Sequence, residues 1–405
     1  MDRTYPKVTV TKKGERFIRG GHIWVFADEV THIDGAYENG DIVDVYTLKG
    51  RYLGSGYLND HSKIRVRILS KNANDRFDEA FYRRRVGYAV DYRAAVMGED
   101  MDACRLIFGE ADSFPGLTVD RFGPVLVAQV LSLGTERVKD IIFRALVDTL
   151  RQRGCTIDAI YERNDAAMRT LEGMEQYKGF YPMNGLRTDL SGEVEITENG
   201  IRYLVDYANG QKTGYFLDQK YNRLALRRIA AGRRVLDCFT HTGAFALNVA
   251  LTADRVTAVD ISDTAIRQAR RNAALNGIAN IDFVTENVFE LLTRMDREKR
   301  HDYDMIILDP PAFTKSRTAT EAAARGYKEI NLKAMRLLPR GGYLATCSCS
   351  HFMSDERFRR MLLSAAADAG VALRQIACRQ QCADHPILWG VDETDYLKFY
   401  IFQVV

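Results

Sequence analysis

The segment Met305–Pro311 (MIILDPP) constrains the fold of this chain of 405 residues more than any other stretch. Its apolar run fits a strand buried in a parallel sheet, and Asp309 then stands at the carboxyl end of that strand, where open α/β sheets bind their ligands. A second strand is predicted over Gly342–Cys347, with Cys349 just beyond its end. An acid and a thiol at the ends of two strands of one sheet can face a single planar substrate. The pattern therefore predicts nucleophilic chemistry on a base.

Length and composition limit the class of protein. A chain of this length can form two or three domains, and 46% hydrophobic residues are enough for a sizeable core. The sequence has no apolar run of membrane-spanning length and its first residues lack the apolar region of a signal peptide, so we expect a cytoplasmic protein without a membrane partner. The odd number of cysteines, seven, does not suit a disulfide framework. Cys378 and Cys382 lack neighbouring zinc ligands, so we expect no metal site.

Three patterns follow one another along the chain. From Lys7 to Leu69, apolar and polar residues alternate in short runs between glycines, which predicts a small β-barrel. The next region mixes helical stretches with strand-like runs and predicts a small α+β domain. Beyond Glu195, strands alternate with helices, as in a doubly wound sheet. We therefore expect a multidomain α/β protein divided into residues 1–72, 73–190 and 191–405.

The hydrophobic pattern also predicts individual elements. In the second region we expect helices over residues 78–97 and 136–151, and a hairpin that includes residues 117–123. The third region contains a predicted helix over residues 263–276. Its predicted strands are Arg234–Asp237, Arg255–Asp260, Ile281–Thr285, Tyr303–Asp309, Gly342–Cys347, Val371–Ala377 and Tyr396–Gln403.

Polar residues stand at the ends of the first three strands of the third region. Asp237 closes the first strand, and a loop containing Gly243 leads from it into a helix, but the other glycines of a nicotinamide-binding loop are absent. Asp260 ends the second strand, where a carboxylate can accept hydrogen bonds from ribose hydroxyls, and Asn287 follows the third. Three strand ends with polar side chains, gathered in one crevice, fit an adenosyl ligand. We therefore expect S-adenosylmethionine as the cofactor.

Several separated motifs resemble those of one known family, in the same order and over nearly the whole chain. They are His22–Phe26, Phe114–Gly123, Gln211–Gln219, Asp309–Phe313, Gly326–Asn331, Ser348–Ser350 and Asp384–Pro386. In these motifs the chain resembles the RlmI-type family of S-adenosylmethionine-dependent large-subunit rRNA methyltransferases, which make 5-methylcytosine. It departs from the family pattern at His241, Ala244, Asn287 and His351.

The resemblance implies a fold, a partner and a set of site residues. The fold would be an N-terminal PUA RNA-binding β-barrel, a central EEHEE-type α+β domain and a C-terminal class I Rossmann-like methyltransferase. The implied partner is large-subunit (23S) ribosomal RNA, and a homodimer is left open. Cys349 is implied as the nucleophile. The expected cofactor-binding residues are Phe216, Asp218, Asp237, Phe239, Thr242, Gly243, Asp260, Ile261, Asn287, Val288, Asp309 and Pro310.

The chemistry of cytosine methylation fits these residues independently. Carbon 5 of cytosine is too weak a nucleophile to accept a methyl group directly, whereas a thiolate that adds to carbon 6 pushes electrons to carbon 5. A carboxyl group near the ring nitrogen, the role we expect for Asp309, stabilises the changing charge. Cys347 faces the same side as Cys349 on an extended strand, and we interpret it as a buried strand residue.

Two alternatives stay open. The first is methylation of a base amino group, although Ala312 stands where an aromatic residue is typical of that chemistry and Cys349 would have no role in it. The second is a module that binds S-adenosylmethionine and RNA without turnover, against which intact Asp309 and Cys349 argue.

Three features outside the methyltransferase site remain. Trp24 is expected in the core of the barrel, and His385 is expected in a loop. The cations Lys12, Lys13, Arg16 and Arg19 fit phosphate contacts and a solvated surface equally well.

Overall fold

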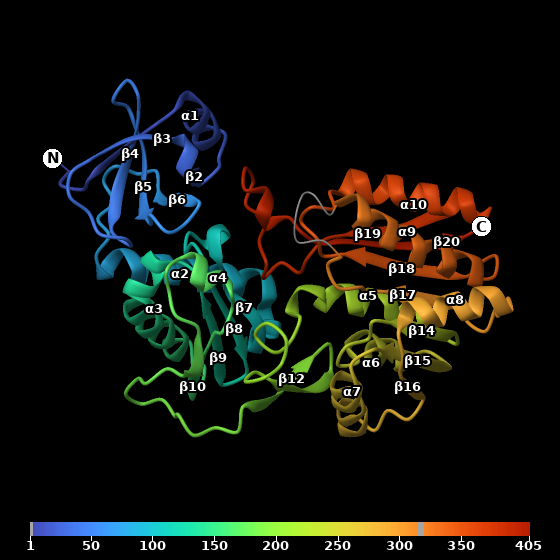
Figure 1. Ribbon diagram of the computed structural model, residues 1–405. Helices are drawn as coiled ribbons and strands as arrows, with labels where there is room; N and C mark the ends of the chain where they lie inside the picture. The colour runs from blue at the N-terminus through green and yellow to red at the C-terminus, as the bar shows by residue number, and fades with distance from the viewer. Residues whose placement is uncertain (1–2, 314–319) are drawn as a thin grey trace. The chain divides into compact units, whose positions relative to one another are not determined.

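The computed structural model describes residues 3–313 and 320–405, which form two compact units (Figure 1). Unit 1 contains the chain up to Ile196 together with Val205–Leu217 and Ala383–Thr394, and unit 2 contains Thr197–Leu204, Asp218–Cys382 and Asp395–Val405. Three stretches of the third predicted range, residues 191–196, Val205–Leu217 and Ala383–Thr394, thus belong to unit 1. The three domain ranges themselves stay a prediction.

The first sheet of unit 1 has six strands in the order β2-β6-β5-β4-β1-β3. Val43 and Val45, two residues apart and so on one face of their strand, are fully buried in the core, and Asp44 between them is also fully buried, where it pairs with Arg3 at 2.7 Å. β1 pairs with β4 in parallel, and the other neighbours are antiparallel. The strands are β1 Lys7–Val10, β2 Trp24–Phe26, β3 Val30–Asp34, β4 Ile42–Thr47, β5 Tyr52–Leu58 and β6 Ile64–Ser70.

The helix α1 (Lys12–Arg19) interrupts this region, which the sequence pattern predicts as short strands only. That prediction is wrong for this segment. The Thr11 hydroxyl caps the helix by accepting a hydrogen bond from the Gly14 amide at 3.2 Å. Its buried residues, Gly14 and Ile18, are four positions apart, so the helix is amphipathic, but it is short and contains a glycine, and the alternating runs around it favoured strands.

The second sheet of unit 1 has the order β11-β10-β9-β8-β7. β9 and β10 are parallel because a long helix, α3, connects them, and the remaining pairs are antiparallel. The predicted helices and hairpin of this region are confirmed. The elements are α2 Glu79–Met97, β7 Ala103–Phe108, β8 Leu117–Phe122, β9 Val125–Val130, α3 Leu133–Gln152, β10 Ala159–Asn164, α4 Met168–Leu171 and β11 Tyr177–Phe180.

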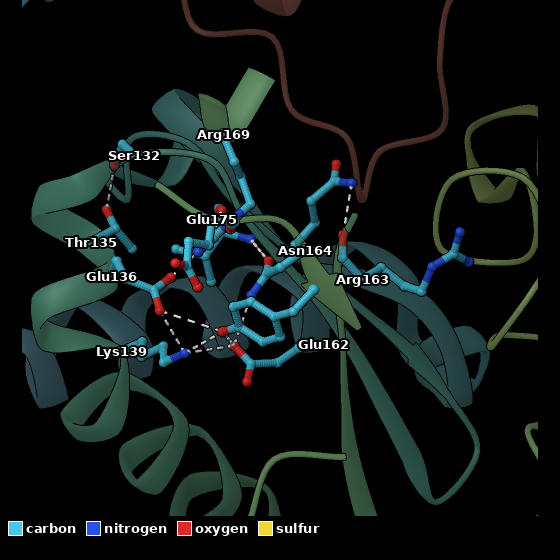
Figure 2. A network of polar contacts seen from close by, with 12 residues as sticks. Ser132, Thr135, Glu136, Lys139, Glu162, Arg163, Asn164, Arg169 and Glu175 are labelled. Carbon is cyan, nitrogen blue, oxygen red and sulfur yellow. Dashed lines mark hydrogen bonds and ion pairs between the residues drawn. The ribbon is translucent and has the colours of Figure 1, made fainter. Parts of the chain in front are cut away.

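A polar network joins α3 to this sheet (Figure 2). The Lys139 Nζ lies 2.7 Å from Glu136 Oε1 and 2.9 Å from Glu162 Oε1, and it donates a hydrogen bond to the Tyr177 hydroxyl at 2.6 Å. Arg169 donates to Glu136 Oε2 at 2.9 Å. Burial acts to raise the pKa of Glu136, but the hydrogen bonds from Lys139 and Arg169 outweigh it and the pKa is lowered. The network thus keeps the poorly hydrated Glu136 carboxylate charged and paired.

Unit 2 is built on a seven-stranded sheet in the order β16-β15-β14-β17-β18-β20-β19. The first five strands in that order are parallel, and β20 and β19 are antiparallel to their neighbours. All seven predicted strands are confirmed to within two residues at each end. They are β14 Arg234–Cys238, β15 Arg255–Asp260, β16 Ile281–Thr285, β17 Met305–Leu308, β18 Tyr343–Ser348, β19 Leu373–Arg379 and β20 Lys398–Val404.

Helices cover this sheet, and the strand order defines where a ligand binds. α9 packs against α8 and α10, and their apolar residues, such as Tyr327, Ile330 and Phe358, form one core cluster with β14, β17 and β18. The strand order runs outward from β14 in one direction and from β17 in the other, and ligands bind at such a switch point. The helices are α5 Lys220–Ala230, α6 Ala244–Ala250, α7 Asp263–Leu275, α8 Val288–Glu298, α9 Thr320–Leu337 and α10 Asp355–Ala369.

Shorter elements complete the description. β12 (Glu193–Glu198) and β13 (Ile201–Asp206) form a hairpin of their own. The 3-10 turns are η1 Ala27–Glu29, η2 Gly98–Asp102, η3 Gly109–Asp112, η4 Leu217–Gln219 and η6 Asp392–Thr394. No helix within residues 3–313 and 320–405 combines the length and apolarity needed to cross a membrane.

Candidate active site

Two carboxylates stand at the switch point of the unit 2 sheet. Asp237 lies near the end of β14 and is fully buried, and Asp309 follows β17 directly, its amide donating to the Cys238 carbonyl at 3.4 Å. Burial raises the pKa of Asp237 to about 7; a hydrogen bond from Thr240 Oγ1 to Oδ2 (2.5 Å) opposes this, and the charge of Asp309 adds to it. Within the described chain, Asp237 Oδ1 has no hydrogen-bond partner. A buried acceptor of this kind is suited to a donor on a ligand.

The loop after β14 is held in an unusual conformation. Phe239 (φ 65°), His241 (φ 50°) and Gly243 (φ 84°) all have positive φ angles. A Cβ atom on Gly243 would lie 2.7 Å from the Leu247 side chain, so this position needs glycine on both counts. Non-glycine residues in this region of φ are strained, and such strain concentrates at functional sites. Thr242 Oγ1, in the same loop, is buried and has no hydrogen-bond partner among the residues described.

The second strand end ties this loop to β15. Asp260 Oδ2 accepts a hydrogen bond from the His241 amide and Oδ1 accepts one from the Ser262 amide, both at 2.9 Å. Each carboxylate oxygen can accept a second bond, so Asp260 retains capacity for hydroxyl donors. Ile261, the next residue, is 70% exposed although it is apolar.

At the third strand end, Asn287 caps α8 by accepting a hydrogen bond from the Phe289 amide at 2.9 Å. The Val288 side chain is packed into the core, which leaves only its backbone for a ligand. The ends of β14, β15 and β16 therefore bring together most of the predicted cofactor residues, although Val288 contributes no exposed side chain.

Asp309 is held by two side chains from other elements. Cys347 Sγ donates to Asp309 Oδ1 at 2.9 Å, and Gln219 Nε2 donates to the same oxygen at 3.4 Å. Burial raises the pKa of Asp309 to about 6; the bond from Cys347 opposes the rise, and the charge of Asp218 adds to it. Burial also raises the pKa of Cys347 well above its usual value, with the Asp309 charge adding to the effect. Cys347 is therefore a neutral hydrogen-bond donor at neutral pH. Its interpretation as a buried strand residue is confirmed.

Cys349 differs from Cys347 in position and exposure. It lies one residue beyond the end of β18 and is half-buried, whereas Cys347 is fully buried within the strand. Lys398, on β20 opposite Ser348, donates from Nζ to the Ser350 carbonyl at 2.7 Å and to the Tyr396 carbonyl at 2.8 Å. This lysine fixes the backbone on the far side of Cys349.

Burial lowers the pKa of Lys398 to about 8, and the charges of Cys349, Asp395, Asp355 and Cys347 act in the opposite direction. Lys398 is thus still a cation at neutral pH. The sequence analysis did not identify Lys398. Its role follows from the pairing of β20 with β18, which a single lysine on an apolar strand does not reveal.

The remaining predicted residues are placed as follows. Asp218 is buried in unit 2, where the Tyr396 hydroxyl donates to its Oδ2 at 2.6 Å. Pro310 is buried directly after Asp309. Phe216 belongs to unit 1, with Lys212 Nζ 4.9 Å from its ring centroid.

Asp384 and His385 also belong to unit 1, in a buried segment between strands. Asp384 Oδ2 accepts a bond from the Arg105 amide at 2.8 Å, and Oδ1 lies 2.8 Å from His385 Nδ1. His385 is a loop residue, as expected. In the part of the chain that the structure describes, no group of three or more potential metal ligands comes together.

Together these carboxylates give the switch point of unit 2 a negative character. The charge of Asp218 acts on Asp309, and the charges of Asp309 and Asp260 act on Asp237. Carboxylates that raise one another's pKa are stabilised by a nearby cation. The site therefore suits a positively charged ligand with hydroxyl and ammonium donors.

Known proteins resemble this chain over its whole length. A family model for PUA-like domains matches residues 8–71, and one for S-adenosylmethionine-dependent methyltransferases matches residues 122–402. The ribosomal RNA large subunit methyltransferase I of Klebsiella pneumoniae (strain 342) is 38% identical over 408 residues, which cover 100% of both chains. Its counterpart in Salmonella arizonae is 38% identical over 406 residues, covering 99% of this chain and 98% of its own.

A solved structure from Streptococcus mutans, described as a SAM-dependent methyltransferase, matches with a TM-score of 0.82 at 22% identity. The match covers 98% of this chain and 100% of that one. At this identity the likeness concerns the fold alone. With the two family models, it confirms the predicted fold class, a PUA-like domain followed by a Rossmann-like methyltransferase.

Proposed function

We propose, from the premise that this chain belongs to the S-adenosylmethionine-dependent methyltransferase family, that it methylates carbon 5 of a cytosine in large-subunit ribosomal RNA. The family membership makes the chain an enzyme that uses S-adenosylmethionine. The RNA substrate is inferred from the relatives, which are named for large-subunit ribosomal RNA, and from the PUA-like domain. The choice of carbon 5 is inferred from Cys349 and Asp309.

The residues at the switch point fit the cofactor. S-adenosylmethionine supplies a methyl group activated by a sulfonium, and it also carries an ammonium group and ribose hydroxyls. The unpartnered Asp237 Oδ1 and the neighbouring carboxylates suit the cationic part. Asp260 retains acceptor capacity for the hydroxyls, and exposed Ile261 offers an apolar surface for an adenine ring. These residues would hold the cofactor, together with Thr242 and Asn287.

Cys349 is the nucleophile in this proposal. Its thiolate adds to carbon 6 of the cytosine, forming an Sγ–C6 bond, while the electrons of the C5–C6 double bond move to carbon 5. Carbon 5 then accepts the methyl group and loses its proton to a base. The electrons of the C5–H bond restore the double bond and expel the thiolate. Attack requires a thiolate, and the ammonium of Lys398 favours that form electrostatically.

In this proposal Asp309 stabilises the charge that develops on the cytosine ring. Because burial raises its pKa to about 6, the carboxyl group can share a proton with a ring nitrogen near neutral pH. The Cys347 thiol and the Gln219 amide both donate to Oδ1, so they orient the carboxyl group and leave Oδ2 for the substrate. Cys347 is a positioning residue in this scheme.

The observation that carries the proposal is the contrast between the two cysteines. Cys347 is buried against Asp309, whereas Cys349 is half-buried beyond the strand end. This contrast supports Cys349 as the thiol that attacks the base.

The test uses RNA that contains 5-fluorocytosine, in which fluorine replaces the proton on carbon 5, so the final elimination is blocked and the covalent adduct persists. Wild-type protein and the matched control Cys347→Ser should form a complex with this RNA that resists denaturation, and Cys349→Ala should not. Nucleoside analysis of the product by mass spectrometry should give 5-methylcytosine. A base methylated on its amino group, or normal turnover by Cys349→Ala, would overturn the proposal.

A further inference from the structure

Trp389 is the most exposed large hydrophobic side chain within residues 3–313 and 320–405. Its exposed fraction is 91%, compared with 70% for Ile261, the next largest. Tryptophan offers the largest aromatic face of any residue, and proteins usually cover most of it. A tryptophan that stands clear of the protein is available for a binding partner.

The backbone around Trp389 is firmly anchored within unit 1. Val391 is fully buried in the core cluster of the first sheet, and Leu388 packs against the same cluster. Leu388 also receives a backbone hydrogen bond from Val391 at 3.0 Å and donates to Thr394 Oγ1 at 2.9 Å. Trp389 is therefore the outward tip of a short turn with fixed ends.

This turn lies against the end of α1. A Cβ atom on Gly390 would be 2.9 Å from the Gly20 carbonyl, and one on Gly21 would be 3.3 Å from the Trp389 carbonyl. Glycine at these positions thus permits the two backbones to touch. The exposed ring of Trp389 and the exposed side of α1 belong to one neighbourhood of unit 1.

The exposed side of α1 combines an aromatic ring with cations. Phe17 is 42% exposed, with the Arg16 guanidinium 5.5 Å and the Lys13 Nζ 5.9 Å from its ring centroid. Lys13 forms ion pairs with Asp28 and Glu29. Among the described residues, Lys12 and Arg16 have no carboxylate partner, so their charge is available to an anion.

We infer that Phe17, Trp389, Lys12 and Arg16 form a platform on which a single-stranded segment of RNA stacks. The inference rests on the proposed RNA substrate and adds a site in unit 1, whereas Cys349 and Asp309 belong to unit 2. Every base has a π face, so two exposed rings bind successive bases with little sequence preference. Arg16 beside the Phe17 ring and Lys12 on the same helix can neutralise the phosphates that link those bases. Separate exposed rings with cations on the adjoining helix suit this partner better than a protein, whose binding needs a continuous apolar patch.

Tryptophan fluorescence tests the inference directly, because the chain contains only two tryptophans. Trp24 is partly buried and donates from Nε1 to Glu110 at 3.1 Å, so it should respond little to RNA. Titration with an unstructured oligouridine should quench the emission of wild-type protein, and Trp389→Phe should lose that quenching. A duplex RNA of the same length should quench less, since its bases are already stacked.

Affinity measurements complete the test. Loss of one stacked base should weaken oligouridine binding by about 5- to 150-fold in Trp389→Ala and in Phe17→Ala, whereas Trp389→Phe should retain most of the affinity. Leu363→Ala, which truncates a residue 68% exposed on α10, is the matched control and should bind like wild type. Arg16→Ala should reduce the salt dependence of binding by about one phosphate contact.

Two results would overturn the inference, and they have different consequences. If Trp389→Ala binds oligouridine as tightly as wild type, the platform is refuted while the proposed methylation stands. If wild-type protein binds no RNA and methylates none, the proposed function fails and the platform fails with it.

Discussion

The buried carboxylate of Asp237 should lower the stability of the folded protein, although the cofactor site needs its charge. Asp237 is fully buried and one of its oxygens has no hydrogen-bond partner among the described residues. The change Asp237→Asn removes the charge and keeps an acceptor for the Thr240 hydroxyl, which now donates to Asp237 at 2.5 Å. We therefore expect Asp237→Asn to be more stable than wild type without cofactor, and to bind S-adenosylmethionine more weakly.

The size of the effect follows from the pKa of Asp237. Burial raises this pKa from the ordinary 3.8 to about 7, so the folded protein binds the proton more tightly than the unfolded chain does. The free energy of unfolding must then fall as the pH rises from about 4 to about 7, and it stays low above that range. The pKa rises by roughly 3, and at about 1.4 kcal/mol for each pKa unit the charged carboxylate lowers the free energy of unfolding by about 4 kcal/mol as an upper value. Asp237→Asn has no charge at this position, so its stability does not carry this cost.

The assay must report on unit 2, and both tryptophans lie in unit 1. Hydrogen exchange in peptides that cover β14 and α6 provides a local measure of the free energy of opening. Between about pH 5 and about pH 8, the stability advantage of Asp237→Asn over wild type should grow by roughly 3 kcal/mol. Thr240→Val, which removes the hydroxyl donor and leaves the charge, should destabilise the same peptides.

Two results would refute this reasoning. The first is a stability difference between Asp237→Asn and wild type that does not change with pH, since it would mean that Asp237 has an ordinary pKa. The second is unchanged cofactor affinity in calorimetry, since it would remove Asp237 from the cofactor site.

Two further predictions concern lysines that the structure places in polar networks. Lys398→Met should raise the pH at which iodoacetamide alkylates Cys349 by about one unit, because an opposite charge nearby stabilises the thiolate, and it should leave cofactor affinity unchanged; an unaltered alkylation profile would contradict the role given to Lys398. Lys139→Met should lower the free energy of unfolding of unit 1 by about 3 kcal/mol, followed in urea by tryptophan fluorescence, because buried Glu162 loses its cation and Glu136 keeps only Arg169. Lys139→Arg should recover part of that loss, and a loss below about 1 kcal/mol in Lys139→Met would show that water replaces the cation.

Much of unit 2 could be predicted because its signals are local. A strand buried on both faces is a short apolar run, and its carboxyl end carries the polar residue that meets the ligand. Met305–Leu308 followed by Asp309 illustrates this rule, and β15 ends at Asp260 as predicted. The helix α1 was missed because it is only eight residues long and lies among alternating runs, although Gly14 and Ile18 have the four-residue spacing of a helix.

The different burial of the two cysteines could not be predicted from the local sequence. Cys347 and Cys349 are two positions apart, and the sequence alone allows both to face one side of an extended strand. In the structure, β18 ends between them, so one thiol is buried against Asp309 and the other is half-buried. Where a strand ends depends on its partners in the sheet, which the sequence of the strand does not specify.

The sequence by itself thus determined which segments become strands and which chemical groups stand at their ends. The tertiary structure alone decided the strand order that creates the switch point, the burial that raises the pKa of Asp237 and Asp309, and the position of Lys398 beside Ser350. It also placed the turn that carries Trp389 against α1, more than 360 residues away along the chain. The physical reason is that hydrophobic periodicity is encoded within a few residues, whereas burial and electrostatic energy depend on neighbours that only folding brings together.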